Sequence, residues 1–112
     1  MRPSLIYWGE FIDLTNGKGS DPPVARWFIG EDLPTGPIRY MRYPKTYNPY
    51  PSFSDDPDRM TSSFYRCGLE DNGGVHNNSG VANKTAYLMT DGDIFNGIAV
   101  GGLGITKVAK IF

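Results

Sequence analysis

The sequence predicts a mainly α, loop-rich unit of about three helices, and three observations support that fold class. Apolar residues recur at helical spacing near residues 4–15, 80–91 and 103–112. Glycine or asparagine residues, which commonly end helices, follow the first two of these segments. The 14 glycines and 9 prolines predict long loops elsewhere. We therefore expect residues 1–112 to form a single small domain with a modest core.

The residues that share one face of the first predicted helix are Leu5, Trp8, Ile12 and Thr15. Asn16–Gly17 then provides a stop signal, and a short apolar stretch at 24–29 is expected to be extended. The segment 30–71 is dense in Pro, Gly, Asp, Ser and Tyr, with at most one helical turn predicted near 38–43. So long an irregular segment is uncommon in a compact domain and usually signals a functional loop.

The second predicted helix follows Ser79, a good N-cap residue, and stops at Gly92. Its apolar stripe consists of Val81, Ala82, Ala86 and Met89. The third predicted helix is marked by apolar residues at helical spacing, namely Ile105, Val108, Ala109 and Phe112. No closing signal follows this last pattern, and the first helix has only a weak start at Pro3–Ser4. We therefore interpret the chain as truncated at both ends.

Composition excludes several classes of function. With 11 basic and 12 acidic residues the formal net charge is −1, so no basic patch indicates nucleic-acid binding. No apolar run approaches membrane-spanning length, and no signal peptide is recognised at the N-terminus. Cys67 is the only cysteine, so it is either a free thiol or one half of a bridge whose partner lies elsewhere.

The most informative segment is DNGGVHNNSGV at residues 71–81, which holds the only histidine of the chain, His76. Asp71 lies five positions upstream, where its carboxylate is expected to reach the imidazole ring. Gly73 and Gly74 allow backbone conformations that other residues resist, so they can fix how the ring is presented on an accessible turn before the second helix. The simpler interpretation is a polar loop with a surface histidine.

The whole string closely resembles the active-site histidine segment of thermolysin-like zinc metallopeptidases. The resemblance extends over nearly the whole chain, because residues 8–14, 27–32 and 38–41 are similar to successive segments of that family's α-helical C-terminal domain. It implies metal-assisted peptide hydrolysis, in which zinc polarises the scissile carbonyl and activates water. It also implies a peptide or protein substrate and a secreted parent enzyme.

The resemblance assigns roles to three residues of this chain. His76 would donate a hydrogen bond to the oxyanion of the tetrahedral intermediate. Asp71 would orient His76 and stabilise its charge. Arg39, between Ile38 and Met41, would hydrogen-bond a substrate carbonyl; the alternative is that it is a plain surface charge.

The departures from the family pattern concern the metals. A single histidine cannot build His-Glu-x-x-His, so zinc ligands and the general base are expected to be absent from this chain. Calcium remains an expectation at three carboxylates, Asp13, Glu31 and Asp32, with solvated loop charges as the alternative. The acidic run at 55–58 is interpreted as an ordinary turn around Pro57 and not as a metal cluster.

Two functional hypotheses of different class follow. In the first, the chain is a piece of a zinc endopeptidase that is inactive alone. In the second, it is a non-catalytic peptide-binding or regulatory module derived from such a peptidase. Under either hypothesis we expect self-association, because apolar helix faces such as Leu5, Trp8 and Ile12 have few partners in a chain this short.

Overall fold

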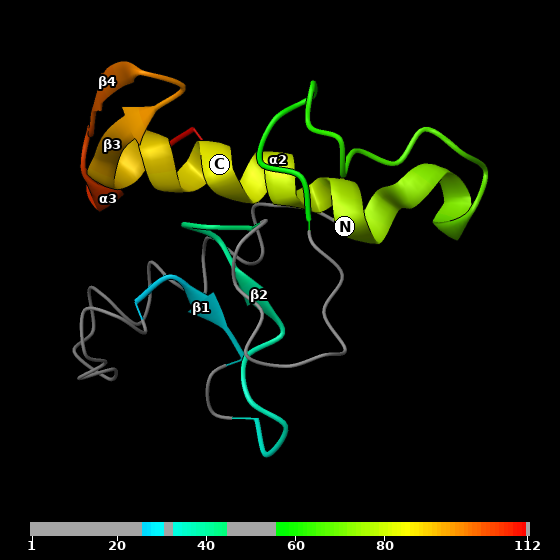
Figure 1. Cartoon of the computed structure of the whole chain (residues 1–112). Helices are drawn as coiled ribbons and strands as arrows, with labels where there is room; N and C mark the ends of the chain where they lie inside the picture. The colour runs from blue at the N-terminus through cyan, green and yellow to red at the C-terminus, as the bar shows by residue number, and fades with distance from the viewer. Residues whose placement is uncertain (1–25, 31–32, 45–55, 112) are drawn as a thin grey trace.

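The computed structural model describes residues 26–30, 33–44 and 56–111. A long helix forms the axis of this part of the molecule, with a short β-hairpin at its C-terminal end and two extended segments packed along one side (Figure 1). The elements, in chain order, are strand β1 (Phe28–Ile29), strand β2 (Arg39–Tyr40), helix α2 (Asp71–Asp91), strand β3 (Gly92–Phe95), strand β4 (Ile98–Gly101) and helix α3 (Ile105–Val108). The mainly helical, loop-rich class predicted from the sequence is confirmed. The described residues contain two helices, and the first predicted helix, near 4–15, lies outside them.

Strands β1 and β2 form a minimal antiparallel pair. Phe28 pairs with Tyr40 and Ile29 pairs with Arg39. The rings of Phe28 and Tyr40 pack together with their centroids 4.3 Å apart. Extension of the apolar stretch at 24–29 is thus confirmed for its described end, and residues 38–43 contain strand β2 and no helical turn, where the sequence allowed at most one. Tertiary pairing overrides the weak local preference there, because each edge residue gains a ladder partner.

Helix α2 starts earlier than the sequence predicted. The assigned helix runs from Asp71, although Asn72, Gly73 and Gly74 have left-handed φ angles of 52°, 82° and 75°. The regular right-handed helix therefore occupies residues 75–91. Ser79 is inside it, and its hydroxyl donates to the carbonyl of His76 at 2.6 Å. The prediction of Ser79 as N-cap was wrong, because a left-handed turn and the Asp71 carboxylate already satisfy the start of the helix.

The hairpin β3–β4 was not predicted, although its turn is encoded plainly. Asn96 and Gly97 form the two-residue connection, with positive φ angles of 51° and 77°. An Asn-Gly pair between apolar residues is the strongest short-range signal of a hairpin. At the other end of β3, Gly92 stops helix α2 as expected, with φ 72° and its N–H bonded to the carbonyl of Leu88.

Helix α3 confirms the third predicted helix but is shorter than residues 103–112. It covers Ile105–Val108 and continues as a turn, in which the N–H of Ala109 donates to the carbonyl of Ile105 at 2.9 Å. Val108 and Ala109 are buried, as their spacing predicted. Phe112 lies outside the described residues.

The core joins the extended segments to helix α2. Its buried members are Trp27, Met41, Ala86, Tyr87, Leu88, Val108 and Ala109. Trp27 meets Tyr87 edge to face, with ring centroids 5.3 Å apart, and its indole N–H donates to Asp91 Oδ2 at 2.7 Å. Lys84 is buried and donates from Nζ to the carbonyl of Arg42 at 2.6 Å. These contacts fix the β2 segment against the helix. No helix in the described part of the chain is long and apolar enough to cross a membrane.

Candidate functional site

The candidate site lies at the start of helix α2, where a left-handed turn reverses the chain. Asp71 shares the left-handed conformation of the three residues that follow it, with φ 53°. This geometry brings its carboxylate back over the first helical turn, where Oδ2 accepts the backbone N–H of His76 at 3.0 Å. By accepting a backbone N–H of the first regular helical turn, the Asp71 side chain acts as a cap. Its negative charge also suits the positive end of the helix dipole.

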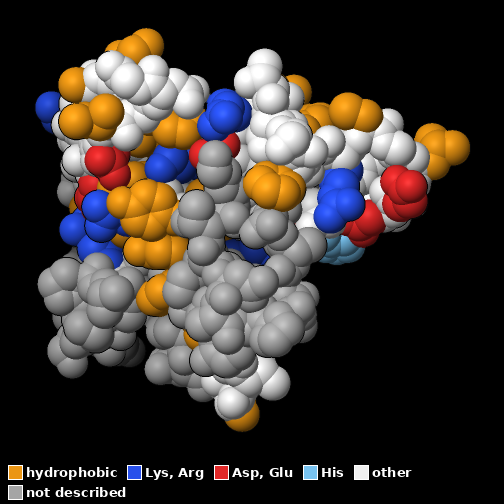
Figure 2. Space-filling model, viewed as in Figure 1, with side chains coloured by type: hydrophobic (Ala, Val, Ile, Leu, Met, Phe, Trp, Pro, Cys, Tyr) orange, Lys and Arg blue, Asp and Glu red, His pale blue; other side chains and the backbone are white. Residues whose placement is uncertain are grey.

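The same carboxylate holds the imidazole ring of His76. Asp71 Oδ1 lies 2.5 Å from Nδ1 of the ring, as the spacing of the two residues predicted. The side chain of His76 is 69% exposed, and the one histidine is visible at the surface beside acidic side chains (Figure 2). Because Nδ1 faces Asp71, Nε2 is left for a ligand. His76 is accessible as predicted, but it lies in the first helical turn and not on the turn before it.

Electrostatics at this pair favour the ionised carboxylate. The hydrogen bond from the His76 ring is the largest cause that holds the pKa of Asp71 below its ordinary value, and the backbone N–H of His76 adds to it. The positive charge of Arg39 lowers the pKa of Asp71 further. The structure therefore brings the three residues that the sequence singled out, His76, Asp71 and Arg39, within electrostatic reach of one another.

A buried carboxylate holds Arg39 in place. Oδ2 of Asp56 lies 3.1 Å from Nε of Arg39, and Oδ1 of Asp56 accepts the amide N–H of Asn77 at 2.9 Å. Asp56 is only 5% exposed. Arg39 also donates from Nη1 to the carbonyl of Ile38 at 2.7 Å. Asp56 thus joins strand β2 to the helix residue directly after His76. The interpretation of this acidic run as an ordinary turn missed the contact, because no local pattern announces a pairing across the fold.

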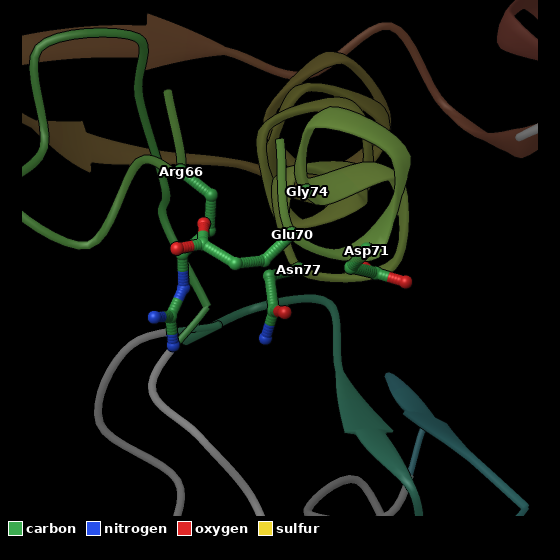
Figure 3. A pocket seen from close by; sticks show the side chains of 5 residues that line it. All are labelled: Arg66, Glu70, Asp71, Gly74 and Asn77. Atoms are coloured by element: carbon green, nitrogen blue, oxygen red, sulfur yellow. The ribbon is translucent and has the colours of Figure 1, made fainter. Parts of the chain in front are cut away.

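A pocket of about 350 Å³ lies beside the start of helix α2, lined by Arg66, Glu70, Asp71, Gly74 and Asn77. In Figure 3 the side chains of Arg66, Glu70 and Asn77 gather on one side of the helix start, and Asp71 extends away from them. The pocket wall is fixed by Asn78, whose side-chain amide accepts from the N–H of Arg66 and donates to its carbonyl, both at 2.9 Å. The result is a polar hollow next to the His76–Asp71 pair.

The remaining sequence predictions concern metals and the thiol. Asp13, Glu31 and Asp32, named for calcium, lie outside the described residues. Among residues 26–30, 33–44 and 56–111, no group of three or more His, Cys, Asp or Glu side chains is placed to hold a metal ion. Cys67 is free and exposed.

Comparison with known proteins points to one family. Residues 7–112 match the family described as thermolysin metallopeptidase, alpha-helical domain. A zinc metalloproteinase of Renibacterium salmoninarum is 44% identical over 105 residues, which is 94% of this chain and 19% of that protein. A thermolysin of Alicyclobacillus acidocaldarius is 42% identical over 110 residues, and a bacillolysin of Bacillus caldolyticus is 41% identical over 110 residues. In both cases the match covers 94% of this chain and 18% of the relative. The chain thus spans about a fifth of the length of these relatives.

Proposed function

Because this chain belongs to the thermolysin metallopeptidase family and matches its alpha-helical domain, we propose that it is a segment of a zinc metalloendopeptidase that contributes the oxyanion-binding and substrate-binding groups. The observation that carries the proposal is the His76–Asp71 pair, which presents one ring nitrogen outward from a capped helix start. Under this proposal the substrate is a peptide or protein, and the parent enzyme hydrolyses it outside the cell.

His76 suits the stabilisation of a developing negative charge. When a peptide carbonyl is attacked, its oxygen becomes an oxyanion that needs a directed donor. Protonated imidazole donates from both nitrogens, so Nδ1 binds Asp71 while Nε2–H is directed at the oxyanion. Asp71 compensates the positive charge of the ring and fixes its orientation through the 2.5 Å contact. Removal of one such donor in other hydrolases costs about 10²–10³ in kcat.

Arg39 is the proposed substrate-binding residue. Its guanidinium carries several N–H donors in a planar fork, which suits a peptide carbonyl oxygen. Nε forms an ion pair with Asp56 and Nη1 donates a hydrogen bond to the carbonyl of Ile38, so the group is held in one orientation. Its side chain is 27% exposed, which leaves part of the fork open to a ligand.

The residues of this chain do not fit the zinc ion of the family. A catalytic zinc site needs three protein ligands, commonly histidines, and the 112 residues include one histidine, whose Nδ1 is held by Asp71. The zinc ligands and the general base are therefore proposed to come from residues outside these 112. We expect the isolated chain, incubated with zinc and casein, to show no chelator-sensitive cleavage; such cleavage above background would refute this part of the proposal. Calcium at Asp13, Glu31 and Asp32 stays part of the proposal.

The alternative is a non-catalytic peptide-binding or regulatory module. The observation in its favour is that the His76–Asp71 pair is built from residues close in sequence. The pair therefore does not depend on the residues that would bind zinc. Binding of an ordinary amide peptide as tightly as a transition-state analogue would favour the module over the peptidase segment.

We also propose that the isolated chain self-associates. The hairpin exposes Ile94 by 73% and Ile98 by 67%, and apolar side chains gather over this end of the molecule (Figure 2). Exposed apolar patches favour association. Light scattering would show a mass that rises with concentration, whereas a constant monomer mass would contradict this expectation.

The test of the proposed function uses a phosphonate dipeptide, in which a tetrahedral phosphorus with an anionic oxygen replaces the scissile carbonyl. We expect the full chain to bind it more tightly than the matching amide peptide, as followed by NMR shifts of the backbone amides around residue 76, which can be observed in the wild type and in the variants alike. His76→Ala should remove the preference, because it should weaken binding of the anionic phosphonate and leave binding of the neutral amide unchanged. Equal binding of the two ligands by the wild-type chain would overturn the proposal.

A further inference from the structure

We propose that Asp56 is a positioning residue, which holds the guanidinium of Arg39 at a fixed distance from His76. Its buried carboxylate does this by contacting Arg39 with one oxygen and Asn77, the neighbour of His76, with the other. The inference rests on the proposed function, because it concerns how the same site is aligned. Asp56 reaches both sides at once: Oδ2 contacts Nε of Arg39 at 3.1 Å, and Oδ1 accepts the side-chain N–H of Asn77 at 2.9 Å.

The shared carboxylate ties together two elements that are otherwise separate at this point. Arg39 belongs to strand β2, which pairs with β1, whereas Asn77 lies in the first regular turn of helix α2. Asn77 follows His76 directly in the chain, so the position of its side chain is tied to that of the histidine. Asp56 therefore fixes the distance between a substrate-binding cation and the oxyanion donor. Small displacements of such groups have large effects on catalysis.

Burial makes the carboxylate effective. Asp56 is 5% exposed, so water competes little for its oxygens. Close packing holds it there, since a Cβ added at Gly80 would lie 2.4 Å from the carbonyl oxygen of Pro57 and 3.0 Å from Cβ of Asp56. Helix α2 therefore approaches the 56–57 backbone as closely as a glycine allows. Asp56 has little room to move relative to the helix.

Only a carboxylate serves both donors. Nε–H of Arg39 and Nδ2–H of Asn77 are both donors, and each meets a different oxygen of Asp56. An asparagine at this position has one acceptor oxygen and one N–H₂ group, so one of the two donors would face another donor. Asp56→Asn thus keeps the shape of the side chain and removes the favourable contact with either Arg39 or Asn77.

The first measurement needs no ligand. In the wild-type chain the Nε–H of Arg39 should give a slowly exchanging NMR signal, because Nε lies 3.1 Å from the buried carboxylate of Asp56 in an ion pair, which limits its access to water. Asp56→Asn should move that signal and speed its exchange with water. Asn77→Ala, a milder change, should shift it less. Asp58→Asn is the matched control, because Asp58 is in the same loop and pairs with its neighbour Arg59 at 3.1 Å. An unchanged Arg39 signal in Asp56→Asn would overturn the inference.

The second measurement uses the phosphonate dipeptide. Asp56→Asn should weaken its binding roughly tenfold, about 1.4 kcal/mol, and should have no further effect in an Arg39→Ala background. Asp58→Asn should bind like the wild type. Additive losses in the double variant, with thermal unfolding unchanged, would show that Asp56 does not act through Arg39 and would overturn the inference. Absence of any binding preference in the wild type would instead reject the proposed function, and the Arg39 signal would still decide the role of Asp56.

Discussion

The two halves of the candidate site meet at the start of helix α2 but are assembled in different ways. His76 and Asp71 are five residues apart and largely exposed, and one left-handed turn brings them together. Arg39, Asp56 and Asn77 come from three segments, and the carboxylate that joins them is buried. The local half needs only its own turn, whereas the remote half needs the strand, the loop and the helix to be docked. A change that loosens the fold should therefore disrupt Arg39 first and leave the His76–Asp71 pair formed.

Gly74→Ala should be the most damaging change to the local half. Gly74 has φ +75°, and an added Cβ would lie 2.4 Å from Cβ of Arg66. Left-handed strain of roughly 1–2 kcal/mol would add to overpacking of about 1–3 kcal/mol. Urea unfolding should thus show a loss of about 2–5 kcal/mol in the free energy of unfolding.

Gly73→Ala is the control for that prediction. Gly73 has φ +82°, but an added Cβ would meet nothing within 4 Å. Only the strain of roughly 1–2 kcal/mol should remain. Equal losses in the two variants would show that the contact with Arg66 is unimportant.

Gly80→Ala should separate the two halves. Its Cβ would lie 2.4 Å from the carbonyl oxygen of Pro57, so the 56–57 backbone would have to move. Overpacking of this kind costs about 1–3 kcal/mol. We expect the Arg39 Nε–H signal to change while the contact between His76 and Asp71 persists in NMR spectra. Loss of both together would contradict the view that the local half forms independently.

The smallest effect is the pH dependence of the local pair. The pKa of Asp71 is below its ordinary 3.8 in the folded chain, so the unfolded chain binds more protons between the two values. The stability from this pair is therefore complete above about pH 3.8 and is lost as the pH falls through the lower folded value.

His76→Ala provides the test of that assignment. It should raise the pKa of Asp71, measured from its carboxyl ¹³C shift, because the ring is the first cause of the lowering. A carboxyl that titrates identically in both proteins would show that the ring does not hold Asp71.

Sequence reasoning succeeded where structure is local. The contact of His76 with Asp71, the stop at Gly92 and the burial of Val108 and Ala109 follow from spacing and from glycine conformations. The start of helix α2 was misplaced because Ser79 and Asp71 are both good capping residues, and only the left-handed turn decides between them.

Contacts across the fold had no such signal. Asp56 in an acidic, proline-containing run reads as a solvated turn, yet it is 5% exposed and bridges strand β2 to helix α2. Lys84 likewise reads as a surface residue of a helix, but its ammonium lies about 5.0 Å from the ring centroid of Tyr87 and bonds to the carbonyl of Arg42. These positions depend on which segments dock together, which composition and periodicity do not specify. The missed hairpin has a different cause, because it is a local feature and the Asn96–Gly97 pair is a sequence signal that predicts it.

The central claim is that His76 supplies the oxyanion donor of a zinc peptidase, and kinetics test it most directly. A chimera would carry this segment in place of the matching 110 residues of the Alicyclobacillus acidocaldarius thermolysin. We expect it to cleave peptides, with kcat reduced about 10²–10³-fold by His76→Ala and KM little changed, because the donor acts in the transition state. An active chimera in which His76→Ala leaves kcat within about twofold would contradict the account.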